Sequence, residues 1–299
     1  MPAPVVKRVD TKHPSVVRRI ISHIKRFDHI CYVHEIRTFS CQRSAQFYTG
    51  YVVYRWIISL ICLAIFITTL GDLGKPPGFK RGVMFYVKYF IYLTNLMLTL
   101  LTVQTTLGAI IVSVAFSVYE NRNPRFTDVK AKGFNFLYWK LHGLSVNLAL
   151  MVSLGYWLIM DGVRTAPHDA NNILSHAVST VVALADWLIT GLPYNFSDAW
   201  MGWLWLICYF IFTIVYWVAG GYSRPSPVEV EPKNRAIYSV CTNYDEKMQS
   251  VLCLVALASI LTTCHVALCL VYSIGRACRP KNQAVPARRY PSVDRRRSP

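Results

Sequence analysis

A threonine and a histidine in two apolar segments have the residue types that a hydroxyl nucleophile and its base need. Thr94 lies about seven to ten residues inside one segment, and His176 lies about four or five inside another. We expect both segments to enter the membrane from the same face, so at about 1.5 Å per residue their depths differ by roughly one turn. An imidazole can take the proton of a hydroxyl that is unreactive at its own pKa. The pair predicts a catalytic site with Thr94 as nucleophile and His176 as base.

Three further polar residues are candidates for supporting positions. Asn95 is the nearest side-chain amide that could donate to an oxyanion, although it lies about 100° around the helix from Thr94. Asp186 lies deep in an apolar segment, where a carboxyl is costly. We expect Asp186 to be protonated, or paired with Asn147 or with a threonine of the Thr94 segment. A purely structural polar cluster is the alternative.

Other polar residues have simpler explanations. Four residues of the Thr94 segment share one helix face and predict a helix–helix seam: Asn95, Thr99, Thr102 and Thr106. His265 and Cys269 lie four residues apart, but two ligands fall short of the three or four that a metal site uses. The sequence therefore predicts no metal site and no cofactor.

Long apolar blocks must position these residues. The chain has 299 residues, of which 54% are hydrophobic and 16% are charged, against about 25% charged in ordinary soluble domains. Blocks of about 20 apolar residues match the roughly 30 Å of hydrocarbon in a bilayer. We predict an all-α, polytopic membrane helix bundle with six transmembrane helices at about 51–70, 84–118, 139–160, 172–192, 200–220 and 250–274. A re-entrant 172–192 segment would reduce the count to five.

The distribution of positive charge predicts the orientation. Loops and tails on the side of the two termini contain 22 Lys and Arg residues, and the opposite side contains 9. Because Lys and Arg collect on the cytosolic side, we expect both termini in the cytosol. The sequon at Asn195 then faces the cytosol and stays unglycosylated, whereas loop 221–249 faces outward. The protein is expected in the plasma membrane or the endoplasmic reticulum.

Three regions follow from these spans. Residues 1–50 form a basic cytosolic segment, residues 51–275 form the transmembrane domain, and residues 276–299 form a basic disordered cytosolic tail. Residues 16–31 have helical apolar spacing, which predicts a basic amphipathic helix on the inner leaflet or one that packs on the cytosolic loops. The net charge of +17 lies mostly in the tails, so we expect them to bind anionic lipids of the bilayer. No zinc-finger or RNA-binding signature supports nucleic acid as a partner. The sequence does not specify an oligomeric state.

The nine cysteines predict free thiols rather than a disulfide framework. Their number is odd and no Cys-x-x-Cys pair occurs. Several lie inside apolar blocks, where buried free thiols are common: Cys62, Cys208, Cys253, Cys264 and Cys269.

Several short motifs, taken in order along residues 45–275, resemble one known family. They are Phe47-Tyr48 with Tyr54-Arg55-Trp56, Tyr92-Leu93-Thr94-Asn95, His176-Ala177-Val178-Ser179-Thr180 leading to Leu192-Pro193, Tyr216-Trp217-Val218-Ala219-Gly220-Gly221 and Ile237-Tyr238-Ser239-Val240. This pattern resembles the rolling stone proteins of insects, within the superfamily that also holds the androgen-induced membrane hydrolases.

The resemblance implies two different functions. The androgen-induced members hydrolyse fatty acid esters of hydroxy fatty acids with a threonine, which matches Thr94, and a histidine, which matches His176. Rolling stone is linked to myoblast fusion, and the residues after Thr94 and His176 follow the rolling stone pattern more closely. We therefore expect either an intramembrane lipid ester hydrolase or a non-enzymatic surface protein in cell–cell fusion or adhesion. In the second case loop 221–249 would make the contacts. A transporter or channel is a third alternative, although no inverted repeat supports it.

Overall fold

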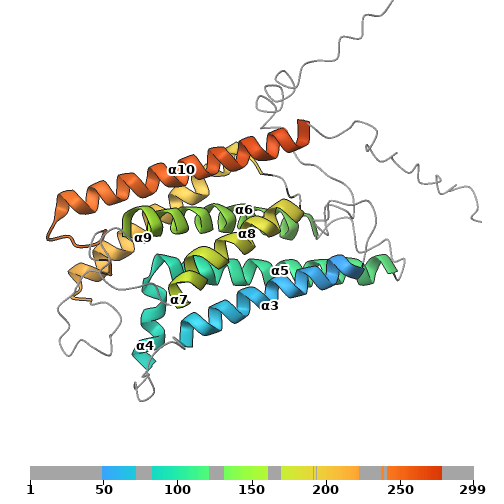
Figure 1. Ribbon diagram of the computed structural model, residues 1–299, viewed down its shortest axis with the longest axis horizontal. Coiled ribbons are helices and arrows are strands. Elements are labelled where there is room, and N and C mark those ends of the chain that lie inside the picture. Colours follow the sequence, from blue (N-terminus) through green and yellow to red (C-terminus); the bar gives the residue numbers. More distant parts are fainter. Residues whose placement is uncertain are drawn as a thin grey trace, which may run out of the picture.

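The chain forms a bundle of long helices, described here from a computed structural model (Figure 1). The structure describes residues 49–71, 83–120, 131–160, 170–190, 192, 194–221, 237–238 and 241–277. The predicted helix at 16–31, nearly all of the tail at 276–299 and most of loop 221–249 lie outside these residues.

Six membrane-spanning helices are confirmed in the described part of the chain. The single-helix spans are α3 (Thr49–Gly71), α5 (Leu93–Glu120) and α10 (Lys247–Ala277). The third and fourth spans each contain a π-helical turn: α6 (Ala131–Gly155) continues into η3 (Tyr156–Met160), and α7 (Ala170–Asn172) continues through η5 (Ile173–Val178) into α8 (Ser179–Thr190). The fifth span begins with the short helix η6 (Phe196–Asp198) and continues as α9 (Ala199–Val218).

The predicted second span at 84–118 is two separate pieces. The short helices α4 (Val83–Val87) and η1 (Lys88–Ile91) come first. Tyr92 then takes an extended conformation, with φ −91° and ψ 131°, and α5 begins at the next residue. In Figure 1, α4 turns away from the line of α5. The part that crosses the membrane therefore begins only at Leu93.

Helix α6 lies at the centre of the bundle. It packs against α5, α8, α9 and α10, while α3 packs against α5 and α8 (Figure 1). In the most apolar part of each span, 56% of the residues are buried for the α5 and α6 spans but only 28% for the α9 span. The outer face of α9 exposes large apolar side chains such as Leu204, Ile211 and Val215, which suits contact with lipid.

The polar stripe on α5 forms part of the seam with α3, as its spacing predicts. Thr102 donates to the carbonyl of Leu98 on its own helix at 2.8 Å and lies 3.3 Å from the carbonyl of Cys62 on α3. The Thr106 hydroxyl lies 2.9 Å from the hydroxyl of Ser59, also on α3. These hydroxyls therefore satisfy their own hydrogen bonds while joining the two helices.

Candidate functional site

The break before α5 places Thr94 in the first turn of a helix. The carbonyl of Tyr92 accepts hydrogen bonds from the backbone N–H groups of Asn95 at 3.1 Å and Leu96 at 3.0 Å. The side-chain amide of Asn95 donates to the carbonyl of Tyr89 at 2.8 Å, so this amide supports the break. The expected depth of Thr94 inside one continuous helix is wrong, because the chain interrupts the helix just before it.

His176 lies in the π-helical turn η5 at the start of the fourth span. Tyr156 lies in the π-helical turn η3 at the end of the third. The two rings stack with their centroids 3.7 Å apart and an interplanar angle of 10°. Turns of this kind widen a helix and are frequent at functional sites. Here the stack holds the buried His176 ring against the third span.

Thr94 and His176 line the same cavity, whose volume is about 390 Å³. Small-molecule sites usually enclose roughly 300–1,000 Å³. The polar part of the lining includes hydroxyl and amide groups of Tyr92, Asn95, Asn172, Ser175 and Thr242. The apolar part includes Val152, Ile159, Met160, Phe210 and Leu257. Among the described residues of this lining there is no Asp, Glu, Lys or Arg. The cavity thus offers uncharged hydrogen-bonding groups next to hydrocarbon.

Tyr238 is a residue of this cavity that the candidate site chosen from the sequence does not include. Its hydroxyl lies within hydrogen-bonding reach of the Thr94 side chain and of the backbone N–H groups of Leu93 and Thr94. Tyr209 on α9 lies near the Tyr238 hydroxyl and donates to the carbonyl of Ile91 at 2.9 Å. Burial raises the pKa of Tyr238 to about 12, so its phenol stays neutral near pH 7. The one sequence signal for Tyr238 is its place in the last motif of the family resemblance.

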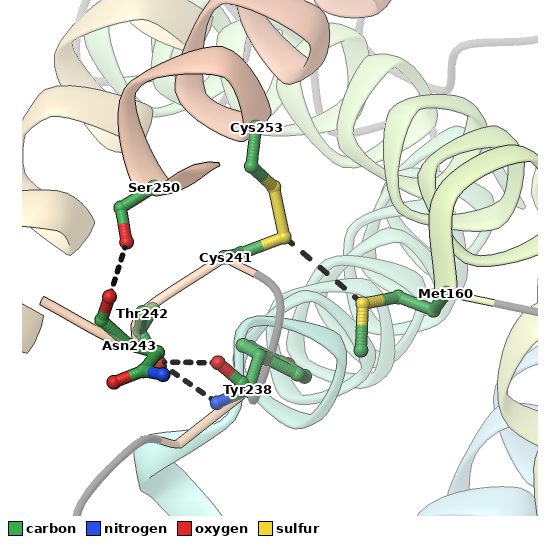
Figure 2. The surroundings of a disulfide bond; sticks show 7 residues. All are labelled: Met160, Tyr238, Cys241, Thr242, Asn243, Ser250 and Cys253. Carbon is green, nitrogen blue, oxygen red and sulfur yellow. Dashed lines mark hydrogen bonds between the residues drawn. A yellow bond between two sulfur atoms is a disulfide. The ribbon is translucent and has the colours of Figure 1, made fainter. Parts of the chain in front are cut away.

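Cys241 lines the cavity and forms a disulfide with Cys253 (Figure 2). It ties the segment before α10 to the second turn of that helix, with 5.2 Å between the two Cα atoms. The Cys241 sulfur lies 4.0 Å from the sulfur of Met160, another wall residue. The prediction that Cys253 is a free thiol is therefore wrong. The other apolar-block cysteines are free, as predicted: Cys62, Cys208, Cys264 and Cys269.

Asp186 lies outside the cavity and pairs with Arg55 of α3. The Arg55 Nη1 donates to Asp186 Oδ1 at 2.5 Å, and both side chains are at most 1% exposed. The Tyr54 hydroxyl donates to the same carboxylate oxygen at 3.1 Å, and Arg55 Nη2 donates to the Tyr138 hydroxyl at 2.6 Å. The predicted pairing of Asp186 with Asn147 or a threonine is wrong, because a cation from the first span occupies that place. The alternative expectation of a structural polar cluster agrees with these contacts.

The ion pair belongs to a larger polar cluster between four helices. His142 Nδ1 lies 2.8 Å from the Gln104 amide nitrogen and 3.7 Å from Asp186 Oδ2. The Gln104 amide also donates to the Tyr138 hydroxyl at 3.0 Å. Gly108 leaves the room for Arg55, since a Cβ at this position would overlap the guanidinium. The cluster therefore depends on a close approach of α3 to α5.

The remaining predicted polar residues also lie away from the cavity. Asn147 packs against Gly202 of α9, where an added Cβ would lie 3.3 Å from its amide nitrogen. The two ring nitrogens of His265 lie 3.1 Å from the Tyr194 hydroxyl and 3.2 Å from the Phe196 carbonyl. Of the five residues proposed for the site, the structure brings together Thr94, Asn95 and His176 and places Asn147 and Asp186 elsewhere.

Comparison with known proteins gives one consistent match. A family model described as "Protein rolling stone" matches residues 27–287. The protein rolling stone of Drosophila melanogaster is 30% identical over 179 residues, which cover 58% of this chain and 62% of the fly protein. The match thus spans less than two thirds of that relative. No solved structure matches significantly.

Proposed function

Because this chain belongs to the rolling stone family and is a multi-pass membrane protein, we propose that it hydrolyses lipid esters within the membrane. The observation that carries the proposal is the cavity shared by Thr94 and His176. These are the positions that the resemblance to the androgen-induced hydrolases matches to their threonine and histidine.

The chemistry assigns one role to each residue. Thr94 Oγ attacks the ester carbonyl while His176 takes the hydroxyl proton, and a tetrahedral oxyanion forms. When the carbonyl re-forms, the bond to the leaving alcohol oxygen breaks, and the imidazolium returns its proton to that oxygen. Water then attacks the acyl–Thr94 ester with His176 again as base. The fatty acid leaves and the Thr94 hydroxyl is restored.

The lining of the cavity supports a lipid as substrate. An ester group needs a few hydrogen-bonding partners, and its alkyl chains need apolar walls. Hydroxyl and amide groups stand beside Thr94, and Val152, Phe210 and Leu257 supply apolar surface. The cavity lies among membrane-spanning helices, so an ester dissolved in the bilayer can reach it without an aqueous cleft.

Labelling by a fluorophosphonate probe tests the proposal. The purified, detergent-solubilised protein is labelled as wild type, Thr94→Ala and His176→Ala. Thr99→Ala is the matched control, because Thr99 lies on the same helix and donates to the Asn95 carbonyl at 2.7 Å. We expect labelling of the wild type and of the control, and loss of labelling in the other two. We also expect hydrolysis of at least one fatty acid ester in a panel of neutral and acidic lipids.

Two results would contradict this proposal. One is a folded wild type that neither reacts with the probe nor cleaves any ester of the panel. The other is equal labelling of Thr94→Ala and wild type, which would place the reactive group elsewhere. Either result would favour the second expected function, a surface protein in cell–cell fusion. The residues 225–236 that would make its contacts lie outside the described structure.

A further inference from the structure

The Thr94 hydroxyl has a direct partner in the cavity wall that is not His176. Tyr238 comes from the segment that precedes α10, more than a hundred residues along the chain from Thr94. Its hydroxyl lies on the same cavity as Thr94, within hydrogen-bonding reach of the Thr94 side chain and of the backbone N–H groups at the start of α5. Those N–H groups have no partners within their own helix. The Tyr238 hydroxyl therefore lies at the N-terminus of the helix that carries Thr94, beside the Thr94 side chain.

The position of Tyr238 is held by a compact turn (Figure 2). The Tyr238 backbone N–H donates to the Thr242 hydroxyl at 2.8 Å, and the Thr242 N–H donates to the Tyr238 carbonyl at 2.9 Å. Between these residues Cys241 forms the disulfide to Cys253 of α10. On its cavity side the Tyr238 ring packs edge to face on Tyr92, with 5.7 Å between centroids. One covalent bond thus anchors Cys241, the residue before Thr242, to a membrane-spanning helix.

A neutral phenol can either donate a hydrogen bond to Thr94 or accept one from it. A hydroxyl is a donor and an acceptor, and its hydrogen rotates to suit its partners. When Tyr238 donates to Thr94 Oγ, the hydrogen of the Thr94 hydroxyl can rotate toward another acceptor, while the oxygen stays in place. Burial keeps the pKa of Tyr238 near 12, so the proton needed for this exchange is present at neutral pH.

We infer that Tyr238 is the positioning residue of Thr94 and that the Cys241–Cys253 disulfide holds Tyr238 in place. The inference rests on the proposed function, because it concerns the reactivity of Thr94. It predicts that the reaction at Thr94 slows when either the phenol hydroxyl or the disulfide is removed, while ligand entry into the cavity stays the same.

Rates of fluorophosphonate labelling at several probe concentrations separate reactivity from binding. Tyr238→Phe removes one hydroxyl and keeps the ring against Tyr92. The matched control is Tyr244→Phe, because the Tyr244 hydroxyl bonds to Thr213 at 2.6 Å away from the cavity. We expect the maximal labelling rate of Tyr238→Phe to fall roughly ten- to hundredfold, the size of effect that misplacement of a reacting group produces. The probe concentration for half-maximal rate should change less than about twofold.

The disulfide arm uses the wild-type protein. Treatment with a phosphine reductant should lower the maximal labelling rate by a similar factor, and reoxidation should restore it. The same reductant should leave a Cys241→Ser/Cys253→Ser double variant unchanged, because its rate is already low. Cys208→Ser, which removes an exposed free thiol, should behave as wild type. This arm decides the matter if Tyr238→Phe fails to fold.

The outcomes separate this inference from the function it rests on. A folded wild type that is not labelled would overturn both. A labelled wild type with Tyr238→Phe and Tyr244→Phe reacting at equal maximal rates would overturn the role of Tyr238 alone. A labelling rate that reductant does not change would overturn the role of the disulfide. A loss in Tyr238→Phe that appears only as weaker probe binding would likewise contradict a positioning role.

Discussion

Replacement of Asp186 by leucine should destabilise this protein more than any surface change. The substitution leaves the Arg55 guanidinium buried without its carboxylate, at 0% exposure between α3, α5 and α8. Burial of a charge in a low-dielectric interior is costly unless a counter-ion is present. Tyr138 still accepts one hydrogen bond from Arg55, but a neutral hydroxyl does not offset a full charge.

The expected loss follows from the burial of both partners. Removal of one member of a fully buried pair typically costs about 3–5 kcal/mol in folding free energy. A chain of this size shifts its Tm by roughly 2–4 °C for each kcal/mol. The Asp186→Leu variant should therefore unfold roughly 6–20 °C below the wild type.

To measure this shift, the protein is heated in detergent, and size-exclusion chromatography of the heated samples reports how much of it remains folded. Arg55→Met/Asp186→Leu removes both charges and should recover most of the loss, because no isolated charge remains. Asp198→Asn is the matched control, since Asp198 pairs with Lys140 while both side chains stay about a fifth exposed, at 21% and 18%. A pair that water still reaches contributes little more than the about 0–1 kcal/mol of a surface pair, so this variant should shift Tm by at most a few degrees. The reasoning fails if Asp186→Leu unfolds within about 2 °C of wild type, or if the double variant is no more stable than the single one.

Three further outcomes are expected. Gly108→Ala should lower Tm because its Cβ would overlap the guanidinium of Arg55 in the buried pair. Gly275→Ala is the control and should leave Tm unchanged, since Gly275 has open space around it. Equal Tm values for the two variants would contradict the close approach of α3 to α5. Alkylation of the unfolded protein should modify Cys241 and Cys253 only after reduction, as read by peptide mass spectrometry, and their modification without reductant would exclude the disulfide. Asn195 should carry no glycan in microsomal membranes, while a sequon introduced at 225–236 should gain one, and the reverse pattern would invert the predicted orientation.

The disulfide gives independent support to that orientation. Disulfides persist in oxidising compartments and are rare in the cytosol. Cys241 lies in the loop before α10, on the side with few positive charges. Charge counting and sulfur chemistry therefore both predict that this side faces away from the cytosol.

The number of spans could be predicted because a bilayer imposes one length on every helix that crosses it. The break at Tyr92 could not, because no glycine or proline marks it and the apolar run continues through it. The break depends instead on distant contacts. Tyr209 of α9 donates to the Ile91 carbonyl, and Asn95 donates to the Tyr89 carbonyl. These bonds satisfy backbone groups that an uninterrupted helix would have satisfied itself.

The disulfide could not be predicted from the sequence, for a different reason. Cys253 lies within an apolar block, where the usual expectation is a buried thiol. Its partner is only 12 residues away in sequence, but the turn that brings them together is built from Tyr238 and Thr242. Neither residue belongs to a motif that predicts a turn, so composition and spacing alone favour two free cysteines.

Depth in the membrane explains both the success and the failure at the polar residues. Matching depth suggested that Thr94 and His176 meet, and both do line one cavity, although the depth assumed for Thr94 was wrong because its span begins at Leu93. The same test places Arg55, the seventh residue of α3, and Asp186, the fifth residue from the end of α8, near one face as well. A buried charge has a stronger need for a partner than a hydroxyl has, so opposite charges at equal depth should be paired first. With Arg55 and Asp186 paired in this cluster, the bundle can leave the Thr94–His176 cavity lined by neutral groups. An uncharged ester suits such a lining better than an ionised substrate would.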